Sequence, residues 1–499
     1  RGSLIERMEI VRGSAMRYIT ALIILLFPLA QAAMATGRPN QEMTSLLDNR
    51  VPALMERYSI PGVAVALIRE GKTVWTAAYG LADPANGTPM TVETHCRVES
   101  ISKSVTAWGV MRLVEQGRID LDAPVTNYIK SWRFPPSPFS VEKVTTRLLL
   151  SQSAGMPLGT IGVRYSPTEK RPSLRQSLYR EAVLTREPGS SFSYSNVGFN
   201  LLELLVEEVT GRDFAEYMRT EVLLPLGMRN SSFDWSADML PPVPPGHDTN
   251  GKAVPVYVYP ERAAGGLFST VDDIAAFVCA GMTRFSHARH GVLSAAGIAG
   301  LYRPRVEIPG LYGIAFDAYG FGHFIERFSN GGFAVSHGGQ GTGWMTHFHS
   351  VPETGDGIVI LTNSQRSWPL FSEILDEWAA WCGLPGMGMG LIVKGQKILW
   401  VFIALIMLAL FAQSARLVRA VSRGGRSFAP LTPSHRGLRA SQLTLALALS
   451  GVLAWTLSLD YLFLTSVFPI ESVWLGYATA LAAAVLAASA VLPEAPGSV

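Results

Sequence analysis

Cysteine is scarce in this sequence. Only three occur among the 499 residues, Cys96, Cys279 and Cys382. Their number is odd, and their spacing matches neither a zinc site nor a disulfide framework. We therefore interpret all three as buried structural thiols, and we expect the chemistry of the protein to need no metal ion and no cofactor.

Charge is also scarce, and the net positive charge comes from one place. Charged residues make up 16% of the chain, against 48% hydrophobic residues. Six arginines lie between positions 416 and 439, in a stretch without Asp or Glu. Without them the formal net charge of +3 would become −3, so the basic balance does not indicate a nucleic-acid-binding surface. We expect no nucleic acid among the partners.

Three nearly uncharged apolar segments, 397–418, 443–463 and 472–492, lie in the last quarter of the chain. Each has about 20 residues, the length that crosses a bilayer as a helix. The loop between the first two carries the six arginines, whereas the loop around Pro469 has no Lys or Arg. The positive-inside bias therefore places the arginine loop in the cytoplasm and the preceding domain outside it.

The N-terminal region has the pattern of a secretory signal peptide. Met16 and Arg17 precede an apolar run over 18–30, and 30–35 contains two small-x-small cleavage sites. The run is too short for a comfortable membrane span. We expect a protein of the bacterial inner membrane with a periplasmic catalytic domain. The predicted units are 1–36, an upstream segment with the signal peptide; 37–384, the folded domain; 385–396, a linker; and 397–499, a three-helix transmembrane domain.

The folded domain combines strands at both of its ends with a middle region, 121–268, that is rich in helix and loop. The expected strands are 62–68, 72–79, 345–350 and 357–362, and the expected terminal helices are 42–58 and 369–381. This order predicts an α/β (α+β) fold, in which an antiparallel sheet from both chain ends is flanked by helices and a helical subdomain carries part of the site.

A hydroxyl and an amine stand one helical turn apart at the start of segment 100–117. Its apolar residues have helical spacing and Gly117 ends it, so Ser100 and Lys103 lie on one face. A buried lysine can lose its proton and act as a base toward the hydroxyl, while the helix N-terminus favours developing negative charge. We predict Ser100 as nucleophile and Lys103 as its base; the alternative is a helix-capping serine beside a solvated lysine.

Two further segments contain candidate site residues. Tyr194 and Asn196 precede a predicted helix over 197–211, where a phenol beside Lys103 can shuttle a proton and an Asn amide can hold both the lysine and a substrate carbonyl. The alternative is a structural tyrosine corner and a helix-capping Asn.

The second segment begins at His337 and runs into a glycine-rich strand with Gly339 and Gln340. The glycines allow a substrate backbone to lie against this strand. The N–H of Gln340 can then form an oxyanion hole together with the N–H of Ser100. The alternative is a glycine-rich turn with a surface histidine.

Together, these motifs resemble those of the penicillin-recognising serine hydrolases, in particular class C β-lactamases and the related peptidases and esterases. Ser-x-x-Lys at 100–103, Tyr-Ser-Asn at 194–196 and His-Gly-Gly at 337–339 follow the order of that family. The supporting runs are LLSQSAGMP at 149–157, PLGM at 225–228 and GGLFST at 265–270. The resemblance covers about 42–380 and implies an acyl-enzyme on Ser100.

Three departures from the family pattern concern the substrate. His337 stands at the position where the family has a Lys that binds a substrate carboxylate. A histidine at this position implies that the contact with the carboxylate depends on pH. No residue is identified as a dedicated deacylation Glu, so efficient β-lactam hydrolysis is not implied. Glu99, next to the nucleophile, is either a substrate contact or a charged residue at the helix N-terminus.

An exported hydrolase domain followed by three membrane spans resembles the membrane-bound peptidases that activate prodrugs. That resemblance implies removal of an N-acyl-D-amino-acid cap. The alternatives are a general D-peptidase, carboxypeptidase or esterase of the same family, and a β-lactam sensor that stays acylated. The expected partners are a small-molecule or peptide substrate, membrane lipid, and a second copy of the chain bound through the membrane helices.

Overall fold

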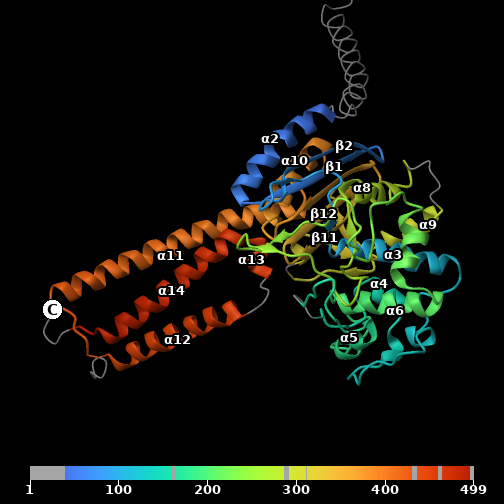
Figure 1. Ribbon diagram of the computed structural model, residues 1–499. Coiled ribbons are helices and arrows are strands. Elements are labelled where there is room, and N and C mark those ends of the chain that lie inside the picture. Colours follow the sequence, from blue (N-terminus) through green and yellow to red (C-terminus); the bar gives the residue numbers. More distant parts are fainter. Residues whose placement is uncertain are drawn as a thin grey trace, which may run out of the picture.

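A nine-stranded antiparallel sheet forms the centre of the larger part of the molecule (Figure 1). The computed structural model describes residues 40–159, 163–285, 291–310, 312–429, 435–458 and 463–494; the predicted signal peptide lies outside the described residues. The strands in chain order are β1 Gly62–Arg69, β2 Lys72–Asp83, β3 Thr88–Pro89, β8 Val306–Glu307, β9 Ala318–Tyr319, β10 Phe324–Arg327, β11 Phe333–Gly341, β12 Trp344–Val351 and β13 Asp356–Thr362.

Strands from the two ends of the domain meet in the middle of this sheet. The spatial order is β3-β2-β1-β13-β12-β11-β10-β9-β8, so β1 pairs directly with β13. This arrangement confirms the predicted antiparallel sheet built from both chain ends. The β1–β2 hairpin closes through Glu70 and Gly71, which both have positive φ (51° and 68°). Two such residues give the turn a twist that matches the flanking strands.

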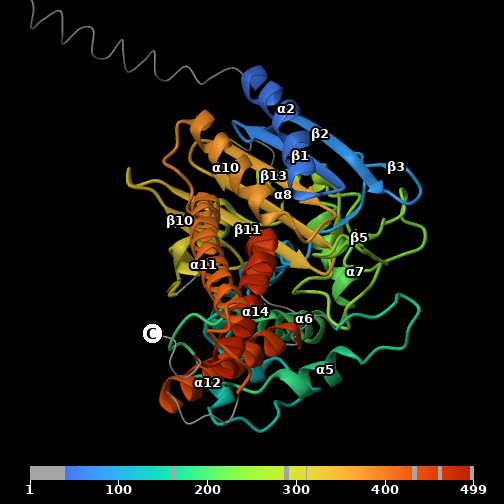
Figure 2. The same cartoon turned by 90° about the vertical axis from the view of Figure 1, so that its left-hand side faces the viewer.

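Helices cover both faces of the sheet. Successive side chains of β1 point to opposite faces and pack with different helices. Val63, Val65 and Leu67 pack with α2 (Asn40–Tyr58) and α10 (Trp368–Cys382), whereas the intervening Ala64, Ala66 and Ile68 belong to the core on the opposite face. Figure 2 shows α2 and α10 on the same side of the sheet. Burial on both faces explains why β1 is apolar along almost its whole length.

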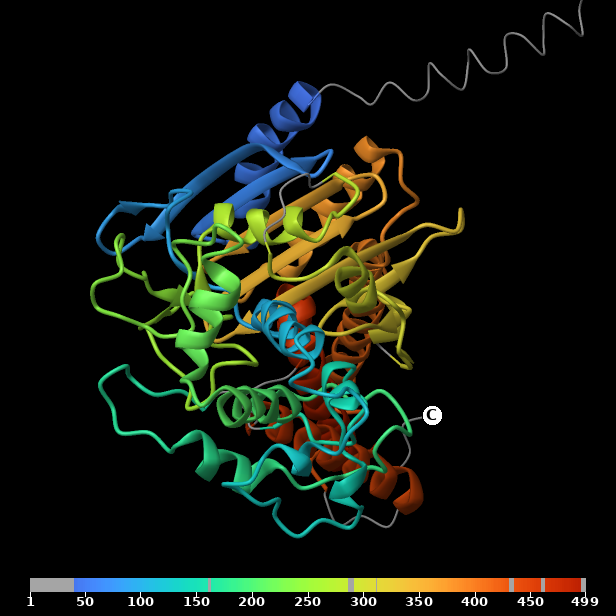
Figure 3. The same cartoon turned by 90° about the vertical axis from the view of Figure 1, so that its right-hand side faces the viewer.

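The opposite face is covered by α3 and by the helical subdomain, with α3 between the sheet and that subdomain (Figure 3). The helices here are α3 Ile101–Glu115, α4 Thr146–Leu150, α5 Leu174–Glu181, α6 Asn196–Thr210, α7 Phe214–Met218, α8 Val271–Ala280 and α9 Ala295–Leu301. Two small ribbons pair β4 (Cys96–Arg97) with β7 (Phe268–Ser269) and β5 (Gly246–His247) with β6 (Ala253–Val254). Short single-turn helices lie at Val125–Asn127, Val141–Lys143, Arg219–Leu223, Tyr312–Ile314 and Gly388–Gly390.

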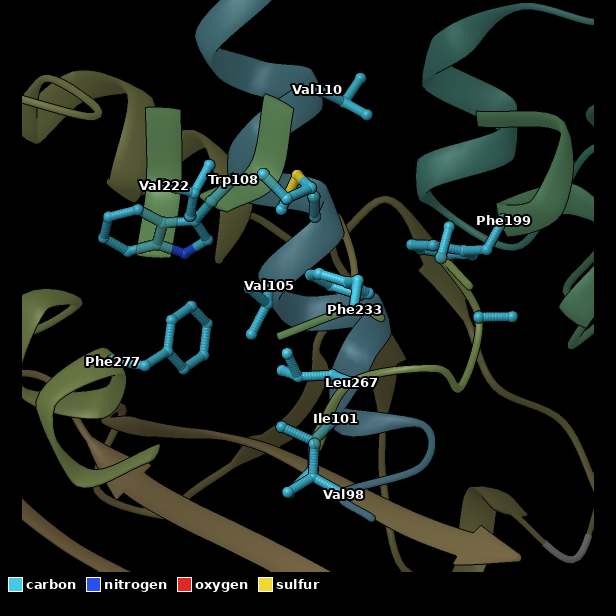
Figure 4. Close-up of a cluster of buried hydrophobic side chains, with 14 of the residues drawn as sticks. Val98, Ile101, Val105, Trp108, Val110, Phe199, Val222, Phe233, Leu267 and Phe277 are labelled. Atoms are coloured by element: carbon cyan, nitrogen blue, oxygen red, sulfur yellow. The ribbon is translucent and has the colours of Figure 1, made fainter. Parts of the chain in front are cut away.

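Helix α3 is buried around nearly its whole circumference (Figure 4). Ile101, Val105 and Trp108 pack on one side, where the Trp108 ring lies 5.5 Å from the ring of Phe277 on α8. Phe199 of α6 belongs to the same core. A helix that is enclosed in this way has its ends fixed by the surrounding layers, and its N-terminus carries the predicted nucleophile.

The cysteines are free thiols, and only one of them is fully enclosed. Cys96 is buried, whereas Cys279 on α8 and Cys382 at the end of α10 are partly exposed. The prediction of three buried thiols is therefore correct for Cys96 and too strong for the other two. Burial nevertheless raises the pKa of all three above that of an ordinary thiol.

Three long helices extend from the part of the molecule that contains the sheet (Figures 1 and 2). They are α11 Leu391–Ser422, α12 Arg436–Ser458 and α14 Pro469–Val491, with the short α13 Phe463–Val467 before the last. By length and composition, all three can cross a membrane. Large apolar side chains face outward, with Leu408 67% and Phe411 74% exposed, as a lipid-facing surface requires.

The segment that we predicted as a linker, 385–396, is packed rather than extended. Met387 and Met389 are buried in the core beside α10, and the Gly388 N–H donates to Glu326 Oε1 at 2.6 Å. Helix α11 already begins at Leu391, six residues before the predicted start of the span. The glycines suggested a hinge, but the intervening methionines bury their side chains and attach the first long helix to the domain.

Candidate active site

Ser100 and Lys103 meet at the N-terminus of α3. The Lys103 ammonium donates hydrogen bonds to Ser100 Oγ at 2.9 Å and to the Ala264 carbonyl at 2.7 Å. Lys103 is fully buried, and this burial lowers its pKa to about 7 although the charge of Glu99 acts in the opposite direction. A large fraction of Lys103 is therefore neutral near pH 7 and able to accept the Ser100 proton.

The polar residues of α3 attach the helix to its neighbours. Ser102 Oγ accepts a hydrogen bond from the Leu267 N–H at 3.0 Å, Ser104 Oγ donates to the Gly322 carbonyl at 2.6 Å, and Thr106 Oγ1 donates to the Ala263 carbonyl at 3.0 Å. All three side chains are buried. They explain the run of hydroxyl residues in the sequence, because each one satisfies a backbone group of the segments that enclose Lys103.

Tyr194 lies beside the Lys103 amine. Its ring centroid is 5.0 Å from Lys103 Nζ, and its ring is nearly parallel to those of Tyr312 and Phe324, whose centroids lie 6.3 and 6.1 Å away. The loop that carries Tyr194 is held by the predicted 149–157 run, since the Ser195 N–H donates to Gln152 Oε1 at 2.7 Å. These contacts place the ring of Tyr194 beside the base, and its role as a proton shuttle stays a prediction.

Asn196 is the first residue of α6 and does not cap it. The cap is Ser195, whose Oγ accepts from the Gly198 N–H at 2.9 Å. Among the described residues, the Lys103 ammonium bonds to Ser100 and Ala264, so the expected contact between Asn196 and the lysine is not formed. The Asn196 side chain is half-buried, and its predicted role toward a substrate carbonyl stays a prediction.

His337 lies on β11 and is enclosed, which corrects our expectation of a titrating histidine. Its Nδ1 is 2.8 Å from the Gly338 carbonyl and its Nε2 is 3.1 Å from the Tyr319 hydroxyl. We therefore assign the proton to Nδ1, with Tyr319 donating to Nε2. Burial and the nearby Lys103 charge hold the pKa of His337 well below its usual range. A neutral His337 cannot supply a pH-dependent cation for a substrate carboxylate.

The glycines of β11 allow this strand to approach the nucleophile. A Cβ added at Gly339 would lie 2.1 Å from the Val98 carbonyl oxygen and 3.0 Å from Glu99 Cβ, so only glycine fits. Gln340 follows on the same strand and pairs with Met345 of β12. The backbone of β11 thus runs against the residues that precede Ser100, and the oxyanion role of the Ser100 and Gln340 N–H groups stays a prediction.

One edge of β11 beside these residues has no strand paired with it in the described part of the chain. Strand β10 pairs with β11 only from Phe333 to Ser336, so within the described residues no strand continues this pairing along His337–Gly341. An extended chain can add to such an edge through main-chain hydrogen bonds. The site therefore combines a nucleophile, a base, a phenol and a strand edge, and in the described part of the chain no cluster of His, Cys, Asp or Glu is suited to a metal ion.

Sequence reasoning missed the groups that surround the lysine and the nucleophile. Ala264 accepts from Lys103 through its backbone, which leaves no side-chain signal. Arg97 pairs with Glu99 at 2.9 Å, and Tyr257 and Tyr259 donate to the same carboxylate. Arg97 and Glu99 stand two residues apart just before Ser100. This spacing was the only signal in the sequence that could have indicated the ion pair.

The comparisons with known proteins agree with this geometry. A family model described as Beta-lactamase matches residues 47–377. The chain belongs to the β-lactamase family. Its motifs and its sheet place it among the penicillin-recognising serine hydrolases.

Among curated proteins, this β-lactamase-family chain is 33% identical to the esterase EstB of Burkholderia gladioli over 36% of its own length and 49% of EstB. It is 25% identical to the protein flp of Staphylococcus aureus (strain NCTC 8325 / PS 47), over 40% of this chain and 39% of flp. The aligned regions thus span half or less of these relatives.

Among solved structures, the penicillin-binding protein homologue from Pyrococcus abyssi, described as octameric, is 26% identical with a TM-score of 0.59, over 71% of this chain and 81% of that one. A class C β-lactamase mutant shares the fold, with a TM-score of 0.55 and 20% identity over 66% of this chain and 95% of that one.

The titration of Lys103 should set the acidic side of the activity profile. Turnover needs the neutral amine of Lys103. As the pH rises and this amine loses its proton, kcat/KM should therefore increase, with a midpoint near pH 7. In H337Q the midpoint should stay within about one pH unit of the wild-type value, because His337 is already neutral. The measurement is the initial rate on a neutral substrate as a function of pH. A larger shift of the midpoint in H337Q would show that His337 is the titrating group.

Tyr194→Phe should lower kcat by about 10²–10⁴-fold, the usual contribution of a positioned acid–base group, with a smaller change in KM. The matched control is Tyr79→Phe, which removes a phenol that donates to Asp48 Oδ1 at 2.7 Å away from the site. Steady-state kinetics of both variants decide the point. Retention of more than half of the wild-type kcat in Tyr194→Phe would rule out the proton-shuttle role.

Proposed function

We propose that this protein is a membrane-anchored serine hydrolase that forms an acyl-enzyme on Ser100. The observation that carries this proposal is the 2.9 Å contact between Ser100 Oγ and the buried amine of Lys103, whose pKa is lowered to about 7. A nucleophile and a base within hydrogen-bond distance, one of them with a shifted pKa, are the requirements of covalent catalysis.

The reaction follows from the positions of these groups. Neutral Lys103 accepts the Oγ proton as the Oγ–carbon bond to the substrate carbonyl forms, and the oxyanion binds at the N–H groups of Ser100 and Gln340. Tyr194 passes the proton to the leaving nitrogen or oxygen, and the bond to that atom breaks. Water then adds to the acyl-enzyme through the same base, which releases the acid and restores the Ser100 hydroxyl.

We propose an amide of peptide character as the substrate, most specifically an N-acyl-D-amino-acid cap on a prodrug. The open edge of β11 beside Gln340 supports a substrate with a main chain that pairs with a strand. The preference for a D residue and for a prodrug rests on the resemblance in architecture to membrane-bound prodrug-activating peptidases. Esterase activity is the second candidate, and the 33% identity to EstB favours it.

We also propose that the three long helices hold the catalytic domain on the periplasmic face of the inner membrane. The outward-facing apolar side chains of α11 support insertion in lipid. Arg426 follows the end of α11 that points away from the catalytic domain in Figure 1, and it pairs with Glu494 at 3.1 Å. A positive loop on that side agrees with a cytoplasmic position.

Covalent labelling tests the acyl-enzyme. A fluorophosphonate should add one label per chain, located on Ser100 by peptide mass mapping, and Ser100→Ala should lose labelling and at least about 10³-fold of turnover. Ser102→Ala is the control, because its hydroxyl accepts from the Leu267 backbone and is not directed at Lys103. Labelling that persists at another serine in Ser100→Ala would show that the nucleophile is misassigned. A matched set of N-acyl-D-Asn amide, N-acyl-L-Asn amide and simple ester then ranks the candidate substrates.

Fusions of a reporter that is active only outside the cytoplasm test the topology. Reporters joined after Gly390 and after Pro469 should be active, and one joined after Gly425 should be inactive, because an arginine costs about 2.5–3.5 kcal/mol at the centre of a span and keeps its loop inside. Immunoblotting of each fusion controls for expression. An active Gly425 fusion would contradict the proposed orientation.

A further inference from the structure

A buried ion pair lies directly beneath the nucleophile. The side chains of Arg97 and Glu99 are only 1% and 3% exposed, and Arg97 Nε donates to Glu99 Oε1 at 2.9 Å. The Tyr257 hydroxyl donates to the same oxygen at 2.9 Å, and the Tyr259 hydroxyl donates to Oε2 at 3.0 Å. Burial raises the pKa of both phenols, so both stay protonated as donors. The carboxylate is thus held by three donors, and its charge is enclosed by protein groups.

Glu99 has an unusual backbone conformation for its residue type. Its φ is +50°, in the left-handed region that favours glycine. The peptide between Glu99 and Ser100 contains the Ser100 N–H, so the conformation of Glu99 sets the direction of one oxyanion donor. A strained residue persists only where its surroundings fix it, and here the three hydrogen bonds to the carboxylate fix it.

The same side chain contacts the strand that carries the second oxyanion donor. A Cβ added at Gly341 would lie 2.2 Å from Glu99 Cδ, and one added at Gly339 would lie 3.0 Å from Glu99 Cβ. Gln340 stands between these two glycines. The Glu99 side chain therefore lies against β11 on both sides of Gln340, and its position limits how closely the strand approaches Ser100.

Arg97 connects this arrangement to the lysine. Its guanidinium donates to the Tyr257 carbonyl at 2.7 Å and to the Gly265 carbonyl at 3.2 Å, and it lies against the rings of Tyr257 and Tyr259 at 4.2 and 4.7 Å from their centroids. Gly265 follows Ala264, whose carbonyl accepts from Lys103. Arg97 thus holds the segment that orients the base.

We propose that Arg97 and Glu99 act as a positioning pair, which sets the two oxyanion N–H groups and the Lys103 amine in one arrangement. This inference rests on the proposed function of Ser100 as nucleophile. Both residues act through others, because their charges are fully paired with protein groups and buried away from solvent. Their effect on the reaction is geometric, through Glu99 on Ser100 and Gln340, and through Arg97 on Ala264.

The full-length protein offers a matched control for this pair. Glu373 of α10 also accepts three donors, from Arg50 Nη2 at 2.9 Å, Arg57 Nη1 at 3.1 Å and the Tyr58 hydroxyl at 2.6 Å. It lies with the core on the other face of the sheet. Glu99→Gln and Glu373→Gln therefore each remove one carboxylate charge from a set of three donors, and only the first touches the site.

Glu99→Gln should lower kcat by about 10-fold to 100-fold, the effect of a misplacement of about 1 Å, with KM changed by less than about 3-fold. Its acidic limb should also move to lower pH. The titratable groups that face Lys103 are Tyr194, Glu99 and His337, and loss of the Glu99 charge removes the interaction that raises the Lys103 pKa. Glu373→Gln should change neither kcat nor the pH midpoint of the acidic side of the activity profile.

The outcomes separate this inference from the proposed function. A wild-type protein that takes no fluorophosphonate label contradicts the proposed nucleophile itself. The positioning pair alone is overturned if the wild type takes the label and Glu99→Gln keeps both the wild-type kcat and the wild-type pH midpoint. Equal losses in Glu99→Gln and Glu373→Gln that follow their melting temperatures also overturn it. If Glu99→Gln does not fold, the double variant Arg97→Met, Glu99→Gln leaves no unpaired buried charge, and it should fold, label slowly at Ser100 and show the same loss of kcat.

Discussion

The burial of the Lys103 amine is the constraint on which the site depends. An isolated charge in a protein interior is unfavourable, so a buried lysine lowers its pKa instead of remaining permanently charged. Here that pKa falls from 10.5 to about 7. The shift requires that α3 be enclosed on every side, by the sheet, by α8 and by the helical subdomain. A helix at the surface with the same residues would have a solvated lysine and no base near neutral pH.

The segment that accepts from Lys103 is held from two sides by charged pairs. Arg97 holds the Gly265 carbonyl, and the buried carboxylate of Glu203 accepts from the backbone N–H groups of Arg262 and Ala263 at 2.6 and 2.9 Å. The Ala264 carbonyl lies between these anchors. Buried ion pairs contribute little net stability, so their placement around this carbonyl is better explained by the accuracy of its position than by the free energy of folding.

The attachment of the long helices follows from packing as well as from chain connection. The segment before α11 buries two methionines beside α10 and donates a backbone N–H to Glu326. Farther along the chain, Trp400 of α11 donates to Glu471 in the first turn of α14 at 2.9 Å. These contacts favour a fixed relation between the folded domain and the long helices, at the segment where the sequence predicted a linker.

Local properties of the sequence were sufficient for several conclusions. A run of strand-forming residues predicted β1, alternation predicted β13, the i, i+3 spacing placed Ser100 and Lys103 together, and apolar length predicted the three long helices, because each signal depends only on neighbouring residues. The tertiary structure decided the rest. Ala264 lies 161 residues from Lys103 in the chain, the neutral state of His337 depends on its burial beside Tyr319, and Tyr257 reaches Glu99 from a separate segment. Whether a polar side chain is enclosed or exposed depends on chain segments far away in the sequence, and no local pattern records which of them will close over it.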